Sequence, residues 1–488
     1  MTIDRIIETI KKNNPDANTE QIQRAYDFAE KAHSGQTRLT GEEYIQHALE
    51  TAYKLATINL DIDTITAGIL HDVPEDTDKT VKDLEQEFGK EIANLVEGIT
   101  KLGSIKYRGL ERYAENLRKM FIAIAEDVRV VFIKFADRIH NLKTLYALPP
   151  VKQQRIARES LDIYAPIAGR LGMEEFKGEL EDLSFPYVLP EQYEWIQKIS
   201  KKKYEEQKRF AEKVKKIIKK EFEKKSDVND FTIEGRAKRY YSLYQKILRK
   251  DMDINKVYDI VALRVIVKDI DNCYRILGYI HQIWKPMKGR IKDYISQPKP
   301  NGYQSLHTTV FGPEGRITEF QIRTQNMHDE AEWGIAAHWA YKNISKEIKI
   351  SKEKIKWIKE LLLEQKKESS NKEYLDSLKL DFFKNRIFVF TPKGDVIDLP
   401  ENATPVDFAY HIHSDLGNKC VSAKINEKKA SLNTSLQNGD MVEILIDKKR
   451  KGPSEEWLSF VQTHLAKDKI KNYIRRQKKI NIFSFFEK

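Results

Sequence analysis

Cysteine and long apolar runs are scarce in this chain of 488 residues. Its two cysteines, Cys273 and Cys420, lie far apart and form no CxxC pair. This spacing gives no support for a disulfide framework or a zinc finger. No apolar run approaches the roughly 20 residues that span a bilayer, and the start, MTIDRIIETIKK, lacks the apolar centre of a signal peptide. We therefore expect a cytoplasmic protein that does not contact a membrane.

Charge, by contrast, is abundant. Charged residues make up 33% of the chain and hydrophobic ones 40%, which is typical of a globular protein rich in surface helices. The length predicts about three domains. The chain has 85 lysines and arginines and 74 aspartates and glutamates, so its net charge is +11. A basic surplus favours polyanionic partners such as nucleotides or RNA.

Candidate metal ligands lie on successive predicted helices in the first third of the chain. They are His47, the adjacent pair His71 and Asp72, and Asp137. A single histidine of this kind is more often structural, but two imidazoles with two carboxylates suit Mn²⁺ or a similar transition ion. The combination therefore predicts a divalent metal site.

Two further acids, Glu75 and Asp76, follow the His-Asp pair. We expect Pro74 to push Val73 out of helical geometry, so that these carboxylates lie on a turn. There they are placed to carry protons to and from a metal-bound water.

The helix that carries Asp137 also carries Asn141, and the i, i+4 spacing places both on one face. Since these two residues occupy the face assigned to the site, we expect His140 to be structural. The same is expected of His33.

A second group of polar residues fills the stretch 289–309, GRIKDYISQPKPNGYQSLHTT. It combines cations for phosphates, an aromatic face for a base and amides for the base edge, with Gly302 letting the backbone turn. The residues concerned are Arg290, Lys292, Lys299, Asn301, Tyr303, Gln304 and His307. This composition predicts a purine nucleotide pocket, and the alternative is a loop of ordinary solvated lysines.

Two predicted strands add charges to this second group. In 317–324, ITEFQIRT, the alternation places Glu319, Gln321 and Arg323 on one face, as expected for metal-bound phosphate. A buried strand, VYDIVALRVIV, contains Asp259 and Arg264, and such charges are costly unless they are paired or bind a metal. Asp259 and Glu319 together would form a two-carboxylate Mg²⁺ site.

A strand-to-helix transition in 231–247, FTIEGRAKRYYSLYQKI, collects further basic and hydroxyl side chains. Cations around a helix start suit a triphosphate, because the helix dipole adds to their field. The alternative is a basic, solvent-exposed helix end. The side chains are Arg236, Lys238, Arg239, Ser242 and Lys246.

The motifs HSGQTR, EEYIQH, HDVPEDT and FADRIHNLKTL together resemble the hydrolase domain of the RelA/SpoT alarmone enzymes, an all-α HD-type phosphohydrolase. The resemblance implies such a domain, with a helical connector, over residues 1–195. In it Mn²⁺ would be held by His47, His71, Asp72 and Asp137. Glu75 and Asp76 would activate the water that removes the 3′-pyrophosphate of (p)ppGpp. The nucleotide contacts would be Arg38, Asn141 and Thr144. Leu39 and Thr40 stand where the family usually has a basic-Ser pair.

The motifs GRAKRYYSLYQK, YDIVALRV, GRIKDYI, PKPNGYQSLHT, EFQIRT and HDEAEWGIAAHWAYK resemble the synthetase domain of the same family. This is an α/β nucleotidyltransferase-like domain of the polymerase-β type, expected over 196–343. It would transfer the β,γ-pyrophosphate of ATP to the 3′-hydroxyl of GTP or GDP.

The resemblance also assigns roles in that domain. ATP would lie against Arg236, Lys238, Arg239, Ser242 and Arg264. GTP or GDP would lie against Lys292, Lys299, Asn301, Tyr303 and His307. Asp259 and Glu319 would bind Mg²⁺, and Glu319 would help to deprotonate the acceptor hydroxyl. The RxKD sequence at 290–293 is the version found in bifunctional members.

After an expected helical linker at 344–385, residues 386–448 resemble a TGS domain, a ubiquitin-like β-grasp module. RIFVFTPKGDVIDLP predicts a hairpin and TPVDFAYHIHSDLG a capped helix. The resemblance implies deacylated tRNA and the ribosome as partners, with His413 as a tRNA contact, although a structural role is equally open. Residues 449–488 are expected to begin a further helical domain that is truncated.

The sequence thus predicts a multidomain α+β protein that makes and destroys (p)ppGpp from ATP and GTP or GDP. Two alternatives stay open. One is a hydrolase whose synthetase is inactive, and the other is a regulator that binds RNA or the ribosome.

Overall fold

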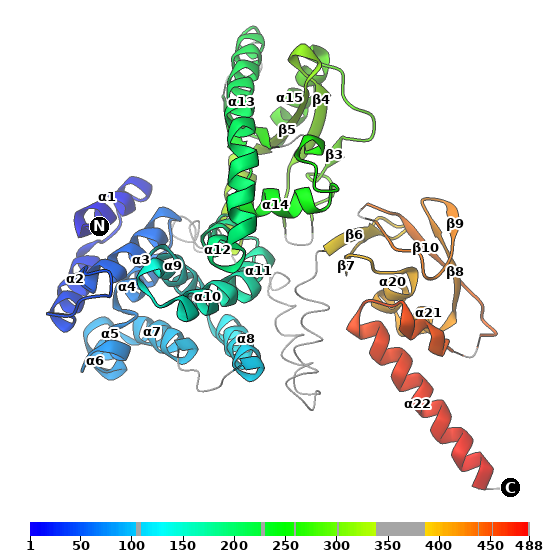
Figure 1. Cartoon of the computed structure of the whole chain (residues 1–488), viewed down its shortest axis with the longest axis horizontal. Coiled ribbons are helices and arrows are strands. Elements are labelled where there is room, and N and C mark those ends of the chain that lie inside the picture. Colours follow the sequence, from blue (N-terminus) through cyan, green and yellow to red (C-terminus); the bar gives the residue numbers. More distant parts are fainter. Residues whose placement is uncertain are drawn as a thin grey trace. The chain divides into compact units, whose positions relative to one another are not determined.

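The computed structural model describes residues 1–103, 109–225, 230–257, 260–299, 302–337, 386–437, 439–450 and 452–486. Asp259, Asn301 and the expected linker 344–385 lie outside these ranges. The chain divides into two compact units, 1–364 and 365–488, so the expected hydrolase and synthetase regions both belong to the first (Figure 1). Within the described residues, no helix has both the length and the apolar character needed to cross a membrane.

The N-terminal part of the first unit is a helical bundle in which α3, α4 and α9 pack on one another. Alanines and branched aliphatic side chains on these helices are fully buried, which fixes the helices tightly together. The helices are α1 (Ile3–Asn13), α2 (Glu20–Ala32), α3 (Ile45–Thr57), α4 (Ile62–Leu70), α5 (Val73–Asp76), α6 (Val81–Phe88), α7 (Lys90–Gly103), α8 (Gly109–Glu126) and α9 (Arg129–Lys143).

The short helix α5 corrects one expectation. Val73 is its first residue and Pro74 lies in its first turn, so Glu75 and Asp76 are helical rather than on a turn. Proline is accepted there because a backbone N–H in the first turn has no helical acceptor.

A second set of helices connects the bundle to the sheet of the first unit. It comprises α10 (Pro150–Glu159), the π-helical turn η2 (Ser160–Tyr164), α11 (Ala165–Arg170), α12 (Glu174–Val188) and α13 (Pro190–Phe222). Two prolines in this region have different effects. Pro186 lies inside the last turn of α12, where only one helical hydrogen bond is lost. Pro190 begins α13 after a break at Leu189.

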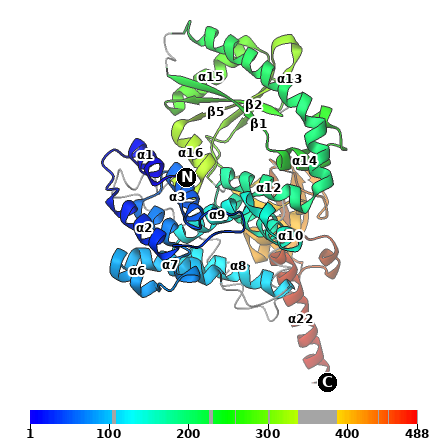
Figure 2. The same cartoon turned by 60° about the vertical axis from the view of Figure 1, so that its left-hand side comes forward.

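A five-stranded sheet follows α13 in the chain. Its strands are β1 (Phe231–Ala237), β2 (Val261–Val267), β3 (Lys292–Asp293), β4 (Leu306–Phe311) and β5 (Ile317–Thr324), in the order β1-β2-β5-β4-β3. Only the β2–β5 pair is parallel. Helices α13 and α15 (Ile270–Ile283) pack with the sheet in one core that includes Val214, Val265, Ile276 and Phe320 (Figure 2). Helices α14 (Tyr240–Leu248) and α16 (Gln325–Trp333) follow β1 and β5.

The second unit contains the predicted hairpin, β6 (Arg386–Phe390) with β7 (Val396–Pro400), and the predicted capped helix α20 (Pro405–Ile412). A capping box between Thr404 and Asp407 starts α20. The remaining elements are α21 (Ser414–Lys419), β8 (Cys420–Ile425), β9 (Lys428–Ala430), β10 (Val442–Ile446), η5 (Glu455–Ser459) and α22 (His464–Phe486). Trp457 and Ile470, from the last two, pack in the same core as Val406 of α20.

Candidate functional site

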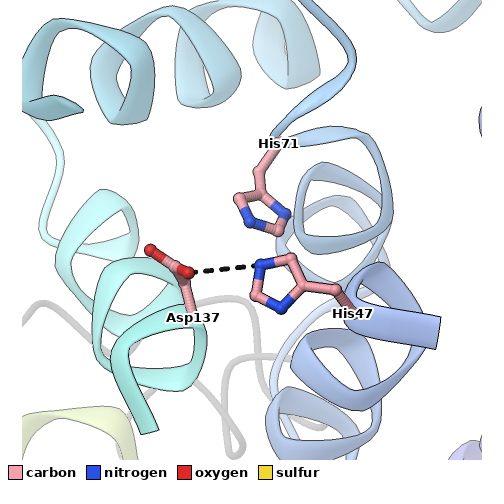
Figure 3. A group of neighbouring side chains, drawn as sticks. All are labelled: His47, His71 and Asp137. Carbon is pink, nitrogen blue, oxygen red and sulfur yellow. Dashed lines mark ion pairs between the residues drawn. The ribbon is translucent and has the colours of Figure 1, made fainter. Parts of the chain in front are cut away.

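The helical bundle gathers the predicted metal ligands at one buried point. His47 of α3, His71 at the end of α4 and Asp137 of α9 have ligand atoms within 4.8 Å of one another (Figure 3). His47 Nε2 lies 3.3 Å from Asp137 Oδ1. Asp72 completes the predicted set, with Oδ1 at 3.2 Å from His71 Nε2 and Oδ2 at 3.3 Å from His47 Nε2. The four side chains come from α3, from the turn between α4 and α5, and from α9, so tertiary packing brings them together.

The state of His71 fits a cation at this point. Its Nδ1 donates to the backbone carbonyl of Gly68 at 2.8 Å, which leaves the lone pair on Nε2. That nitrogen is buried and makes no hydrogen bond. Burial lowers the pKa of His71, so the ring is neutral near pH 7. A neutral imidazole nitrogen among carboxylates is the donor that a divalent ion requires, and the three residues of Figure 3 form a candidate site for one.

His140 lies closer to the site than expected. Its Nδ1 is 2.7 Å from Nδ1 of His47 and 3.0 Å from Nη1 of Arg38. Because positions i and i+3 of a helix share a face, α9 presents both Asp137 and His140 to the cluster. Burial, His47 and Arg38 lower the pKa of His140 to about 3, so it is a neutral acceptor that can orient His47.

Two polar residues of the site escaped the sequence analysis. The Tyr44 hydroxyl donates to Asp72 Oδ2 at 3.0 Å and also to Asp76. Lys134 Nζ donates to Asp137 Oδ2 at 2.7 Å. Although burial opposes it, Lys134 and then His47 hold the pKa of Asp137 well below its usual value. A helical-spacing signal existed for both, since each lies three residues before a predicted ligand.

A cavity of about 510 Å³ opens onto this cluster, and Asp137 and Lys134 belong to its lining. The predicted nucleotide contacts Arg38, Asn141 and Thr144 all line it, and Arg38 Nη2 donates to Asn141 Oδ1 at 2.6 Å. Further cations in the lining are Arg138 and Arg155. A basic cavity beside a metal-type cluster suits a phosphorylated ligand.

Glu75 and Asp76 lie beside the cluster on α5. Asp76 accepts the Tyr44 hydroxyl, while Glu75 keeps part of its side chain in solvent. Burial of its carboxyl raises the pKa of Glu75 to about 7, Lys134 opposes this, and Asp72 and Asp76 add to it. A carboxyl that titrates near neutrality can both accept and release a proton.

The strand register places the second predicted site on the sheet face away from α13 and α15. Glu234 is opposite Arg264, Arg264 opposite Gln321, and Gln321 opposite His307. Residues opposite one another in a sheet project to the same face, as do residues two apart in a strand. This face therefore carries predicted residues from all five strands. They are Arg236 of β1, Arg264 of β2, Glu319 of β5, His307 of β4 and Lys292 of β3.

The predicted guanine contacts form an aromatic and cationic group at β4. The Tyr303 hydroxyl lies 2.7 Å from His307 Nε2, and Lys299 Nζ lies 4.7 Å from the Tyr303 ring centre. His307 Nδ1 is 3.8 Å from Glu319 Oε1. Burial, Lys299 and Lys292 lower the pKa of His307 to about 3, so this ring is neutral. Asn301 and Asp259 fall outside the described residues, so this geometry does not include them.

Of the remaining predicted ATP contacts, Arg239 ion-pairs with Glu175 of α12. A Cβ on Gly178 would lie 2.4 Å from Cδ of Arg239, so the glycine makes room for this side chain. The backbone N–H of Lys238 donates to the carbonyl oxygen of Ile260, the residue before β2. Ser242 lies in the first turn of α14.

In the second unit, His413 caps α21. Its Nδ1 accepts the backbone N–H of Asp415 at 3.2 Å, while the side chain is 70% exposed. The ring thus has a structural role, and most of its surface faces solvent.

Comparison with known proteins agrees with these observations. Family models match in the order HD domain (residues 25–174), region found in RelA / SpoT proteins (235–346) and TGS domain (387–446). This confirms the expected fold class.

Curated relatives carry both names that the two sites led us to expect. A guanosine-3′,5′-bis(diphosphate) 3′-pyrophosphohydrolase of Aquifex aeolicus is 44% identical over 98% of this chain and 68% of its own length. A GTP pyrophosphokinase of Myxococcus xanthus is 45% identical over 96% and 62%, respectively. The bifunctional (p)ppGpp synthase/hydrolase SpoT of Escherichia coli K12 is 43% identical over 95% and 66%. The chain thus spans 62 to 68% of the length of these three relatives. Identity at this level over nearly the whole chain shows that it belongs to the RelA/SpoT family.

Proposed function

We propose that this chain is a bifunctional alarmone enzyme that hydrolyses the 3′-pyrophosphate of (p)ppGpp and synthesises (p)ppGpp from ATP and GTP or GDP. One observation carries the proposal. A single compact unit contains a buried His-Asp cluster beside a basic cavity and, separately, a sheet face lined with cations and carboxylates. The first arrangement suits hydrolysis of a phosphate ester, and the second suits transfer between two nucleotides.

In the hydrolase site, His47, His71, Asp72 and Asp137 would hold the divalent ion, which we propose is Mn²⁺. When bound, such an ion supplies Lewis acidity and lowers the pKa of water. The cations of the cavity would orient the nucleotide's phosphates, with Arg38, Asn141 and Thr144 in contact with it. Glu75, with its pKa near 7, would take the proton of the attacking water, assisted by Asp76.

In the synthetase site, we propose that ATP binds Arg236, Lys238, Arg239, Ser242 and Arg264. Lys292, Lys299, Asn301, Tyr303 and His307 would bind GTP or GDP, with the base stacked on the Tyr303 ring. Glu319, together with Asp259, would bind Mg²⁺ and accept the proton of the 3′-hydroxyl. The 3′-oxygen bonds to the β-phosphorus of ATP while the α–β bridging bond breaks, so that AMP leaves. The cationic face would act by alignment and charge stabilisation.

The second unit supports a further part of the proposal, contact with deacylated tRNA and the ribosome through a surface that includes His413. Its exposed ring leaves an edge available for a nucleotide. Because all the proposed substrates are nucleotides of the cell interior, we propose a cytoplasmic location. Tighter binding of deacylated tRNA to the unmodified chain than to His413→Ala would support the contact, and equal binding would remove it.

Two incubations test the enzyme. Incubated with ATP, GTP and Mg²⁺, the chain should yield (p)ppGpp and AMP. Incubated separately with ppGpp and Mn²⁺, it should yield GDP and pyrophosphate. Asp137→Asn should abolish only the second reaction and Glu319→Gln only the first. Product in the ppGpp incubation but none in the ATP and GTP incubation would favour the hydrolase-only alternative. Salt-dependent RNA binding with no turnover in either incubation would favour the binding regulator.

A further inference from the structure

One carboxylate oxygen in the first unit is shared by three guanidinium groups. Glu332 Oε1 accepts from Arg236 Nη1 at 2.9 Å, from Arg264 Nη2 at 2.9 Å and from Arg323 Nη2 at 3.0 Å. The arginines come from β1, β2 and β5, whereas Glu332 comes from α16. The carboxylate therefore joins three strands from outside the sheet.

Burial makes this contact strong. Glu332 is 7% exposed, Arg264 is 5% exposed and Arg323 is 1% exposed. Charge-assisted hydrogen bonds at this depth are poorly screened by water, and a buried charge without its partner is strongly destabilising. The positions of the Arg264 and Arg323 guanidinium groups consequently depend on Glu332, whereas the Arg236 side chain, which is 40% exposed, is held by the same oxygen nearer the solvent.

Two further carboxylates form longer ion pairs with the cluster. Glu234 Oε2 is 3.8 Å from Arg264 and Glu175 Oε2 is 3.9 Å from Arg236, both beyond hydrogen-bond distance. His328 Nδ1 accepts from Arg264 at 3.3 Å and from Arg323 at 3.0 Å. The short hydrogen bonds from the three guanidinium groups to a carboxylate thus converge on Glu332, while Glu234 and Glu175 act at longer range.

The helix that carries Glu332 is itself fixed. Trp333 packs edge-on against Phe176 of α12 at 6.4 Å, and Ile335 donates its N–H to the carbonyl of Leu171 at 3.0 Å. Glu332 cannot follow a moving arginine, so it acts as a fixed anchor.

We propose that Glu332 is a positioning residue of the synthetase site, which holds Arg236 and Arg264 by direct hydrogen bonds in the arrangement that receives ATP, while buried Arg323 ties the same carboxylate to β5. The inference rests on the proposed function, in which Arg236 and Arg264 contact ATP. It adds a residue that touches neither nucleotide.

Glu332→Gln tests the proposal in the full chain, with Asp329→Asn on the same helix as the matched control. We expect KM for ATP and the equilibrium Kd for ATP to rise at least ten-fold in Glu332→Gln. KM for GTP and the rate of ppGpp hydrolysis should stay within two-fold of those of the unmodified chain. Glu332→Asp, which keeps the charge on a shorter side chain, should recover part of the ATP affinity. Asp329→Asn should leave all four quantities unchanged.

Unchanged ATP affinity in Glu332→Gln would overturn the proposal. A parallel loss of GTP affinity and of hydrolysis would also overturn it, because that pattern indicates a general structural role. If Glu332→Gln does not fold, Glu332→Asp decides the question, since ATP affinity alone must fall. If the unmodified chain transfers no pyrophosphate, the proposed function fails by itself, while the ATP binding measurements still test the positioning role.

Discussion

His71 donates a hydrogen bond from Nδ1 to the backbone carbonyl of Gly68, at 2.8 Å and within the same turn of the chain. This bond fixes the ring orientation and leaves Nε2 directed towards His47, Asp72 and Asp137. The metal-binding tautomer is thereby selected by the backbone of α4 before any ion binds.

Replacing His71 should therefore remove the metal site. We expect His71→Ala to weaken Mn²⁺ binding, measured by titration calorimetry, by on the order of 100-fold or more and to abolish ppGpp hydrolysis. His464→Ala, which removes a histidine of the second unit, is the matched control and should bind Mn²⁺ normally. Undiminished Mn²⁺ binding by His71→Ala would contradict the assignment of this ligand.

Tyr44→Phe removes only the hydroxyl that joins Asp72 to Asp76. Because the ring still stacks on His33 at 4.6 Å, we expect the fold to be kept. The two carboxylates lose their common donor, so the rate of ppGpp hydrolysis should fall about ten-fold, which corresponds to roughly 1.4 kcal/mol. Tyr53→Phe on α3 is the control and should hydrolyse ppGpp at the normal rate. The hydroxyl has no role in hydrolysis if both variants behave alike.

Gly334→Ala should destabilise the first unit. Gly334 has φ 55° and ψ −126°, and a Cβ there would lie 2.2 Å from the carbonyl oxygen of Leu171. The atoms that this Cβ would meet belong to the backbone of Leu171 and Gly172, which cannot shift without disturbing the fold. We therefore expect the free energy of unfolding, measured in urea, to fall by roughly 3 kcal/mol or more.

Gly278 offers the control for that experiment. It lies inside α15, and a Cβ there would meet no atom within 4 Å. Gly278→Ala should therefore be neutral or stabilising by up to about 1 kcal/mol. An equal loss of stability in both variants would show that the close approach of Gly334 to Leu171 is unimportant.

Glu181 of α12 should make stability depend on pH. Burial raises its pKa to about 7, Lys177 opposes this, and Glu174 and Asp182 add to it. The folded chain thus binds this proton more tightly than the unfolded chain, and stability falls as pH rises from about 4.5 to 7. Glu181→Gln removes the cost of ionising a buried carboxyl. The calorimetric unfolding temperature of this variant should therefore exceed that of the unmodified chain at pH 8 but not at pH 4. The gain is at most roughly 3 kcal/mol, and less because the side chain is partly exposed. A gain of the same size at both pH values would contradict the titration of Glu181.

Much of the local structure could be predicted from the sequence. The helix of Asp137 and Asn141 and the strand of Glu319, Gln321 and Arg323 follow from apolar spacing, which depends only on the chain near each residue. The error at Pro74 has the same local origin, because a proline that ends one helix can equally begin the next.

The sequence by itself determined which side chains could bind a metal or a phosphate, and which secondary structure carries them. Only the tertiary structure decided that His140 touches His47, that Tyr44 links Asp72 with Asp76, and that Glu332 collects three arginines. These contacts join residues up to 96 positions apart in the chain. They exist because close packing of helices and strands fixes distances that no local spacing encodes.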